Sequence, residues 1–155
     1  MNNIEILTKL ADRTISYFQE DLLLSINTSY KIEEVSEIKY FDISSLISLS
    51  SDMIGTVSMS VSNKLAFSMV ENFIFGEMSK DELSELSSEN VAETLNVTLG
   101  NILTELDVVK NGGKVNISTP YTMCNSVTIS KKKNGKMYVC ELTLNDEIII
   151  LSYMI

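Results

Sequence analysis

The 155-residue sequence contains no histidine. That absence removes the Ser-His-Asp and Cys-His pairs that activate nucleophiles, and it removes the imidazole ligands of most zinc sites. A complete glycine-rich phosphate loop is also missing, since the glycines at 112 and 113 follow a predicted helix and are typical of its end. Any chemistry of this chain must therefore use carboxylates, amides, hydroxyls or lysines.

The sequence also lacks the features of a secretory signal and any apolar run of membrane-spanning length. Its 12 basic and 21 acidic residues leave a net charge of −9, which repels nucleic-acid backbones and anionic lipid. We therefore expect a cytoplasmic protein with no nucleic-acid or membrane partner. The length and the 45% apolar content predict a single soluble domain over residues 1–155.

Cysteine is scarce, and Cys124 and Cys140 do not have the CxxC spacing of metal or redox motifs. Both lie in segments that resemble strands. They are expected to be small buried apolar residues in a reducing compartment, and a disulfide or a metal pair is the alternative.

Three segments have the apolar spacing of amphipathic helices: residues 3–25, a segment that starts after Ser62, and residues 84–109. Ser62 is a plausible N-cap, and Gly76 is expected to end the second helix. In that helix Met69 and Phe73 are predicted to point inward. The third helix has an inward stripe formed by Val91, Leu95, Leu99, Ile102, Leu103 and Leu106.

The remaining segments have strand character, and residues 56–61 alternate serine or threonine with apolar residues, which predicts one solvated face. Residues 126–131 and 136–144 are predicted to form a hairpin across Asn134-Gly135. The last strand, after Asn145-Asp146, is apolar on both faces and is expected at a central position or a buried oligomer edge. The fold class is α+β, an antiparallel sheet with helices packed on one face.

Within the third helix, polar residues and a glycine form a ridge beside the apolar stripe. Glu89, Glu93, Asn96 and Gly100 fall within about 60° of one another on a helical wheel. A glycine inside a helix costs about 1 kcal/mol relative to alanine, and it allows another chain to come close. The simpler interpretation is that Glu93 and Asn96 are ordinary exposed helix positions, since E-x-x-N is a common spacing.

The stretch ETLNVTLGN, residues 93–101, resembles the active helix of the CheC, CheX and FliY phosphatases of bacterial chemotaxis. A GTVSMSVS strand that leads into a helix ending in FG, and the proline at Pro120, extend the resemblance over nearly the whole chain. One copy of the motif points to a CheX-like member, because the second helix has Glu71 but isoleucine at position 74. Two departures are Glu89, where the family often has aspartate or serine, and a spacing from Asn96 to Pro120 about one residue longer than usual.

The resemblance implies a CheC/CheX-like fold and a hydrolase that removes the aspartyl phosphate from a CheY-type response regulator. It implies catalytic roles for Asn96, which would place a water, and for Glu93, which would pair with a lysine of the regulator. Gly100 would allow close approach, and Glu89 is either a rim contact or a solvated helix charge. The chain would hold no metal and no cofactor of its own, Mg²⁺ would come with the regulator, and the protein would form a homodimer.

Two other functions stay open at this point. A CheX-like fold could bind a response regulator or a flagellar switch component without catalysis. A phosphatase for a small metabolite is less well supported, because the sequence has neither a metal cluster nor a phosphate cradle. The acidic residues Asp81, Glu82 and Glu85 are expected before the third helix, where they suit its positive dipole end and require no metal.

Overall fold

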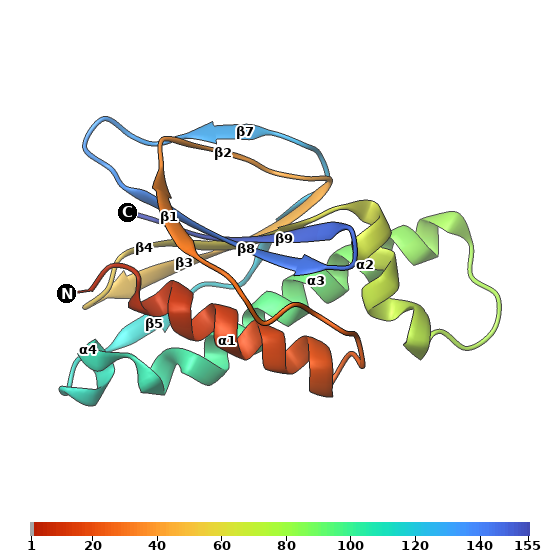
Figure 1. The fold of residues 1–155 in the computed structure, drawn as a ribbon, viewed down its shortest axis with the longest axis horizontal. Helices are drawn as coiled ribbons and strands as arrows, with labels where there is room; N and C mark the ends of the chain where they lie inside the picture. Colours follow the sequence, from red (N-terminus) through yellow and green to blue (C-terminus); the bar gives the residue numbers. More distant parts are fainter. Residues whose placement is uncertain (1) are drawn as a thin grey trace.

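The computed structural model describes residues 2–155, and it places helices on one side of an antiparallel sheet (Figure 1). The helices are α1 (Glu5–Glu20), α2 (Asn63–Val70), α3 (Lys80–Ile102) and α4 (Asp107–Lys110). The strands are β1 (Ile32–Val35), β2 (Glu37–Lys39), β3 (Ile43–Ser51), β4 (Gly55–Val61), β5 (Val115–Ile117), β6 (Tyr121–Met123), β7 (Thr128–Ser130), β8 (Met137–Leu144) and β9 (Glu147–Met154). The predicted α+β class is confirmed.

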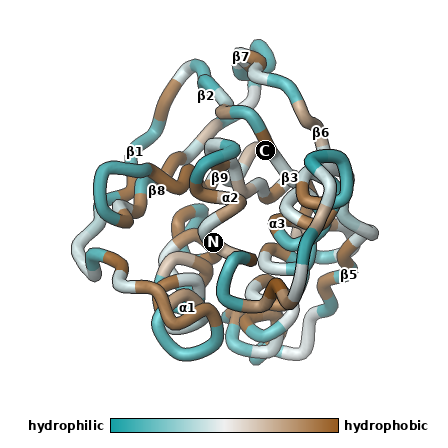
Figure 2. The backbone as a smooth tube through the Cα atoms, turned by 90° about the vertical axis from the view of Figure 1, so that its right-hand side faces the viewer, coloured by the Kyte–Doolittle hydropathy of each residue, from teal (hydrophilic) through white to brown (hydrophobic). Residues whose placement is uncertain are grey.

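The main sheet has the strand order β1-β8-β9-β4-β3-β5, and β6 also pairs with β3. A separate two-stranded sheet, β2 with β7, lies on the face opposite the helices. In Figure 2, α1 and α3 lie below the main sheet and β7 lies above it. The main sheet is therefore covered on both faces. Among residues 2–155, none of the helices combines the length and the apolar character that a membrane crossing requires.

Alternation along the strands builds the core on the helix side of the sheet. In β4, Val57, Met59 and Val61 are fully buried and belong to the main hydrophobic cluster. In β9, Ile149 and Leu151 are fully buried in the same cluster. Residues two apart point to the same face of a strand, so this set forms a continuous apolar surface. The amphipathic helices α1 and α3 pack on it.

The second face of the main sheet is not solvated, which corrects the prediction for residues 56–61. Ser58 and Ser60 in β4 and Ser152 in β9 are fully buried. The Tyr40 hydroxyl donates to Ser58 Oγ at 2.9 Å, and Ser58 also bonds Ser152. The Phe41 N–H donates to Ser60 Oγ at 2.8 Å. The alternation of polar and apolar residues predicted that the serine face of β4 is exposed to solvent. Instead the β2 and β7 layer covers these serines, and their hydroxyls are hydrogen-bonded within the protein.

The bounds of the three predicted helices differ from the structure. Ser62 caps α2 as expected, since its Oγ accepts from Leu65 N–H at 3.1 Å. The helix ends at Val70, however, and Phe73 lies in a following 3₁₀ turn with 50% of its surface exposed, so its predicted inward position is wrong. The first helix is also shorter than its predicted range 3–25. These two predicted ranges included the turns that flank the helix, because apolar spacing continues past the helix ends.

The third helix begins before the predicted Ser84 because a capping box precedes it. Ser79 Oγ accepts from Glu82 N–H at 3.1 Å, and a Glu82 carboxylate oxygen accepts from Ser79 N–H at 3.0 Å. Asp81 and Glu82 therefore lie in the first turn of α3, and Glu85 lies inside the helix rather than ahead of it. The helix ends at Ile102, and a 3₁₀ turn and α4 follow up to Lys110.

The predicted hairpin across Asn134-Gly135 does not form. β7 pairs with β2, and β8 pairs with β1 on one side and β9 on the other. The turn itself is present, since the Gly135 N–H donates to the Lys132 carbonyl at 2.9 Å. The Asn-Gly sequence predicts that the chain reverses direction, but it does not determine whether the two flanking strands pair with each other.

The final strand, β9, lies in the centre of the main sheet between β8 and β4, which is one of the two positions predicted for it. Both of its edges are paired within the chain, so it cannot form the oligomer contact that was its other predicted role. Asn145, with φ +53°, turns the β8–β9 connection. Cys140 is buried in β8 as expected, and burial raises the pKa of its thiol to about 12. Cys124 is exposed and lies outside any strand, so the expectation that it is buried is wrong; both thiols are free.

Replacing Tyr40 by phenylalanine tests the buried polar layer. The variant removes a hydroxyl from a fully covered hydrogen-bond group, and we expect the free energy of unfolding to fall by about 1 kcal/mol. The urea midpoint, measured at an unchanged slope, checks this. Tyr121→Phe is the matched control, since Tyr121 is 67% exposed and should give no change. Equal midpoints for Tyr40→Phe and the wild type would contradict the proposed contribution.

Candidate functional site

One apolar face holds α3 against the sheet. Val91, Leu95 and Leu99 follow one another at four-residue spacing and are fully buried, and Thr94 and Thr98 are buried beside them. The Thr98 hydroxyl donates to the Thr94 carbonyl at 2.7 Å, so it is satisfied within the helix. The helix contacts β3 and β4 of the main sheet, and it also contacts α1, α2 and β6. Its remaining face is open to solvent.

The predicted ridge lies on that open face. Glu89, Glu93 and Gly100 are exposed, and Asn96 is half-buried. Their spacing of four, three and four residues places them along one line of the helix surface. Among the hydrogen bonds and ion pairs of residues 2–155, none involves the Glu93 or Asn96 side chain. The structure thus brings the four residues together and leaves the carboxylate and the amide available to another molecule.

α1 borders this ridge through Tyr17, a residue that sequence reasoning did not single out. The pKa of the Tyr17 phenol is raised, first by burial and then by the negative charges of Asp21 and Glu93, while the Thr94 hydroxyl acts in the opposite direction. Glu93 is therefore close enough to α1 for its charge to affect this phenol. No local motif marks Tyr17, because only the packing of α1 on α3 brings it to the site.

The other segment of the resemblance lies near the same helix. Pro120 immediately precedes β6, and β6 contacts α3. The neighbouring Tyr121 side chain is 67% exposed. A strand follows Pro120 as expected, but β5 (Val115–Ile117) already precedes it, and only the structure shows that the strand after Pro120 lies beside α3.

The charges on the helix limit the chemistry that it can perform. Residues 81–102 include five acidic side chains and no lysine or arginine, and Lys80 stands at the N-terminal end. Among residues 2–155, no group of three or more cysteine, aspartate or glutamate side chains could hold a metal ion. A phosphoryl group needs positive charge around its oxygens. The ridge can orient water and pair with a cation, but the cations must come from a second molecule.

Gly100 is not required by the chain itself. A Cβ added at this position meets nothing within 4 Å, and the residue is exposed within a regular helix. Gly55 is the opposite case, because its φ is +140° and an added Cβ would lie 2.5 Å from the Met154 carbonyl oxygen. The intrinsic cost of Gly100 to α3 is therefore not offset by any contact within the described residues.

Gly100→Ala should stabilise the free protein by roughly 0.5–1 kcal/mol, because alanine is the better helix former and fits without a clash. Gly55→Ala should destabilise it, since both its backbone and the carbonyl of Met154 oppose a side chain there. Urea unfolding of the two variants and the wild type shows whether each substitution raises or lowers the free energy of unfolding. A lower midpoint for Gly100→Ala would show that the glycine serves the fold of the chain.

A family model and several solved structures are similar to this chain. The model of the family described as chemotaxis phosphatase CheX matches residues 43–143. The CheX crystal structure from Vibrio vulnificus is similar, with a TM-score of 0.77 and 18% identity, over 96% of this chain and 97% of that one. CheX from Desulfovibrio desulfuricans gives a TM-score of 0.73 and 14% identity, over 96% and 97%.

A third similar structure is the CheX-CheY-BeF₃-Mg²⁺ complex from Borrelia burgdorferi, with a TM-score of 0.68 and 17% identity, over 97% of both chains. No curated protein sequence matches the chain. The structural likenesses show the fold, and the family model covers more than half of the sequence, including the whole of α3 and its Glu93-x-x-Asn96 ridge. This chain belongs to the CheX chemotaxis phosphatase family.

Proposed function

We propose that this chain, as one domain over residues 1–155, hydrolyses the aspartyl phosphate of a CheY-type response regulator. The observation that carries the proposal is the pair formed by the exposed Glu93 and the half-buried Asn96 on α3, whose side chains have no hydrogen-bond or ion-pair partner among residues 2–155. The related protein from Borrelia burgdorferi forms a complex with CheY, BeF₃ and Mg²⁺. A regulator of that type is the expected partner here.

The charge distribution supports a division of the chemistry between two proteins. Phosphoryl transfer depends mainly on positioning and on neutralising the phosphoryl oxygens. The chain carries a net charge of −9 and the face of α3 has no cation, so it is suited to a partner with a positive site. Mg²⁺ held by the regulator would neutralise phosphoryl charge, and this chain needs no cofactor of its own.

Asn96 is the residue proposed to place the attacking water. Its amide both donates and accepts hydrogen bonds and does not titrate, so it can orient a water at any pH of interest. The water oxygen forms a bond to phosphorus in line with the aspartyl oxygen, whose bond to phosphorus breaks. The products are inorganic phosphate and the free aspartate carboxylate, and the proton of the water goes to phosphate.

The other residues of the ridge would fix how the two proteins meet. Glu93, one turn from Asn96, is proposed to pair with a lysine in the regulator's active site, which sets the register of the two surfaces. Glu89 would make a rim contact with a basic edge of the regulator, a weaker interaction because it stays solvated. Gly100 would let the regulator's backbone approach α3.

The rate of decay of a phosphorylated response regulator from the same cell tests these roles. With the wild type at catalytic amounts we expect accelerated decay. Asn96→Ala should reduce the acceleration by roughly 100-fold or more, a loss typical of a group that acts on the reacting water. Glu93→Gln should weaken regulator binding and slow decay, and Glu89→Gln should change binding by about twofold or less.

Matched controls lie on the same helix and elsewhere. Asn101→Ala removes an exposed amide that points away from the ridge, and Glu34→Gln removes an exposed carboxylate in β1. Both should behave like the wild type. If a regulator binds but its decay is unchanged by the wild type, the chain is a non-catalytic binding module of the same family. If Asn101→Ala matches Asn96→Ala, the water-placing role is refuted.

We also propose that the protein is a homodimer, which would give two ridges per particle. Because β9 is central, the strand edges available for pairing are β1 at one end of the main sheet and β5 with β6 at the other. Sedimentation equilibrium at micromolar concentration should give twice the mass of the chain. A mass equal to one chain across that range would contradict the proposal.

A further inference from the structure

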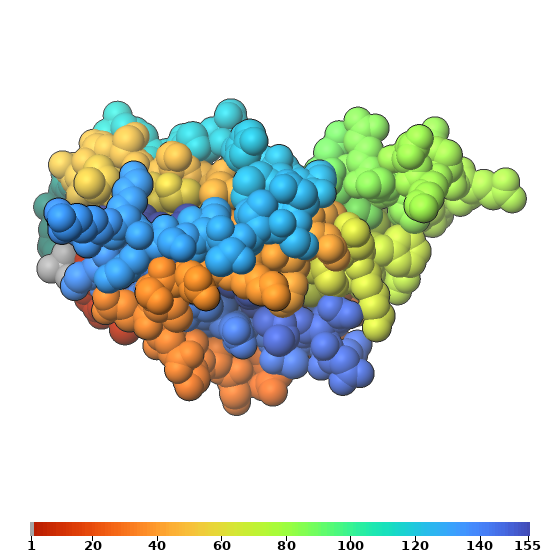
Figure 3. Space-filling model, turned by 90° about the horizontal axis from the view of Figure 1, so that it is seen from above, coloured from red at the N-terminus to blue at the C-terminus, as the bar shows by residue number. Residues whose placement is uncertain are grey.

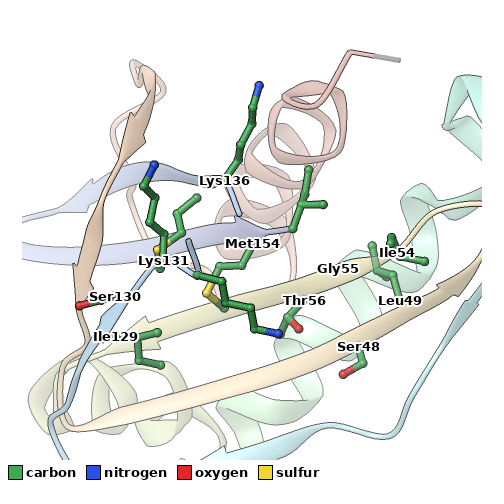
Figure 4. Close-up of a pocket in the computed structure, with 13 residues that line it drawn as sticks. Ser48, Leu49, Ile54, Gly55, Thr56, Ile129, Ser130, Lys131, Lys136 and Met154 are labelled. Atoms are coloured by element: carbon green, nitrogen blue, oxygen red, sulfur yellow. The ribbon is translucent and has the colours of Figure 1, made fainter. Parts of the chain in front are cut away.

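A cavity of about 490 Å³ opens on the face of the main sheet that the helices do not cover. It lies beside the β2 and β7 layer. Figure 4 shows Lys131 and Lys136, from the β7–β8 connection, on one side of it. On the other side lie Ser48 of β3, Thr56 of β4 and Ile54 of the turn between these strands. Its volume is within the range of small-molecule sites in proteins.

Strand alternation separates this cavity from the phosphatase ridge. Thr56 and Met154 line the cavity, whereas their neighbours Val57 and Tyr153 are buried in the core below α1 and α3. Successive residues of a strand point to opposite faces. The cavity therefore lies across the sheet from Glu93 and Asn96, and a molecule bound there would not touch the ridge.

Positive charge is concentrated at this cavity in an otherwise acidic protein. Residues 131–136 contain four of the 12 basic residues of the chain, and Lys131, Lys132 and Lys136 line the cavity. The ion pairs of residues 2–155 involve Lys9, Lys31 and Lys64, and none of the cavity lysines. No aspartate or glutamate side chain lines it. Hydrogen bonds between the backbones of Lys136 and Ile155, at 2.9 and 3.0 Å, fix the start of β8.

The walls between the lysines are largely apolar. The apolar residues that line the cavity are Ile54, Ile129, Met137, Met154 and Ile155, together with Leu49, whose side chain belongs to the helix-side core. Ile54 is 64% exposed, so a molecule bound in the cavity could bury apolar surface of this side chain. The hydroxyls of Ser48, Thr56 and Ser130 supply hydrogen-bonding groups. The site thus offers cations at its rim and an apolar surface inside.

We propose that this cavity binds a small molecule with an anionic head group and an apolar body. The lysines would hold a carboxylate, sulfonate or phosphate, and Ile54, Met137 and Met154 would cover the body. The concave shape and the limited volume fit a small molecule rather than a flat lipid surface or a long peptide. The strong negative charge of the rest of the protein restricts anions to this patch.

A matched pair of fluorescent probes tests the proposal. Anilinonaphthalene sulfonate has an anionic head on an aromatic body, and phenylnaphthylamine is its uncharged counterpart. We expect the sulfonate to bind the wild type at one site. Replacing Lys131, Lys132 and Lys136 together by glutamine should raise its dissociation constant by about tenfold, from the sum of three exposed charge contacts. Binding of the uncharged probe should be unchanged.

Two sets of variants control for charge and for other apolar surfaces. Glutamine at Lys64, Lys80 and Lys110 changes the net charge by the same three units. None of these lysines lines the cavity, and the change should leave sulfonate binding within about twofold. Thr56→Trp should fill the cavity and weaken both probes. Phe75→Ser removes the 93% exposed phenylalanine of the α2–α3 connection, the projection at the right of Figure 3, and should change neither.

Amide shifts in a nitrogen–proton NMR spectrum locate the probe. Shifts confined to the β3–β4 connection and residues 129–137 support the proposal, and displacement by octanoate but not by inorganic phosphate shows that both the head and the body contribute. The proposal is overturned if the two lysine triple variants bind the sulfonate equally well. It is overturned as well if the shifts fall on the Phe75 segment.

Discussion

The burial of one face of α3 against β3 and β4 is the constraint on which the candidate site depends. Fully burying one leucine or valine side chain contributes roughly 1.5–3 kcal/mol, more than any exposed charge on the same helix can contribute. Because Val91, Leu95 and Leu99 are fully buried, the rotation of the helix about its axis is determined. The same rotation turns Glu93, Asn96 and Gly100 to solvent in one line.

Under the proposed function, the ridge on α3 would let a chain without histidine, and without a metal cluster in its described residues, act within a phosphatase family. A helix face that carries carboxylates, an amide and a glycine contributes position rather than charge neutralisation. That arrangement is economical only if the second protein brings the cations. Within residues 2–155, no contact requires the glycine and the side chains of Glu93 and Asn96 are unpaired, which is consistent with a surface that binds a partner.

The main sheet separates two environments in the molecule. Its helix side is apolar and supports α3. Its other side carries a buried layer of serine hydroxyls around Tyr40, covered by β2 and β7, and continues into the lysine-rimmed cavity. This small second layer forms because β7 pairs with β2 and not with a strand of the main sheet. The β7–β8 connection, which carries the lysines, therefore passes over an apolar part of the main sheet.

The sequence by itself determined the α+β class, the approximate positions of the main helices and the membership of Glu89, Glu93, Asn96 and Gly100 in one ridge, and it narrowed the apolar last strand to a central position or a buried oligomer edge. These follow from local periodicity, which a helix or a strand converts directly into faces. Only the tertiary structure decided that β7 pairs with β2, that Ser58 is buried, that Phe73 is exposed and that Tyr17 borders Glu93. Those outcomes depend on contacts between residues far apart in the chain, and no local pattern encodes which edge or face a distant segment will cover.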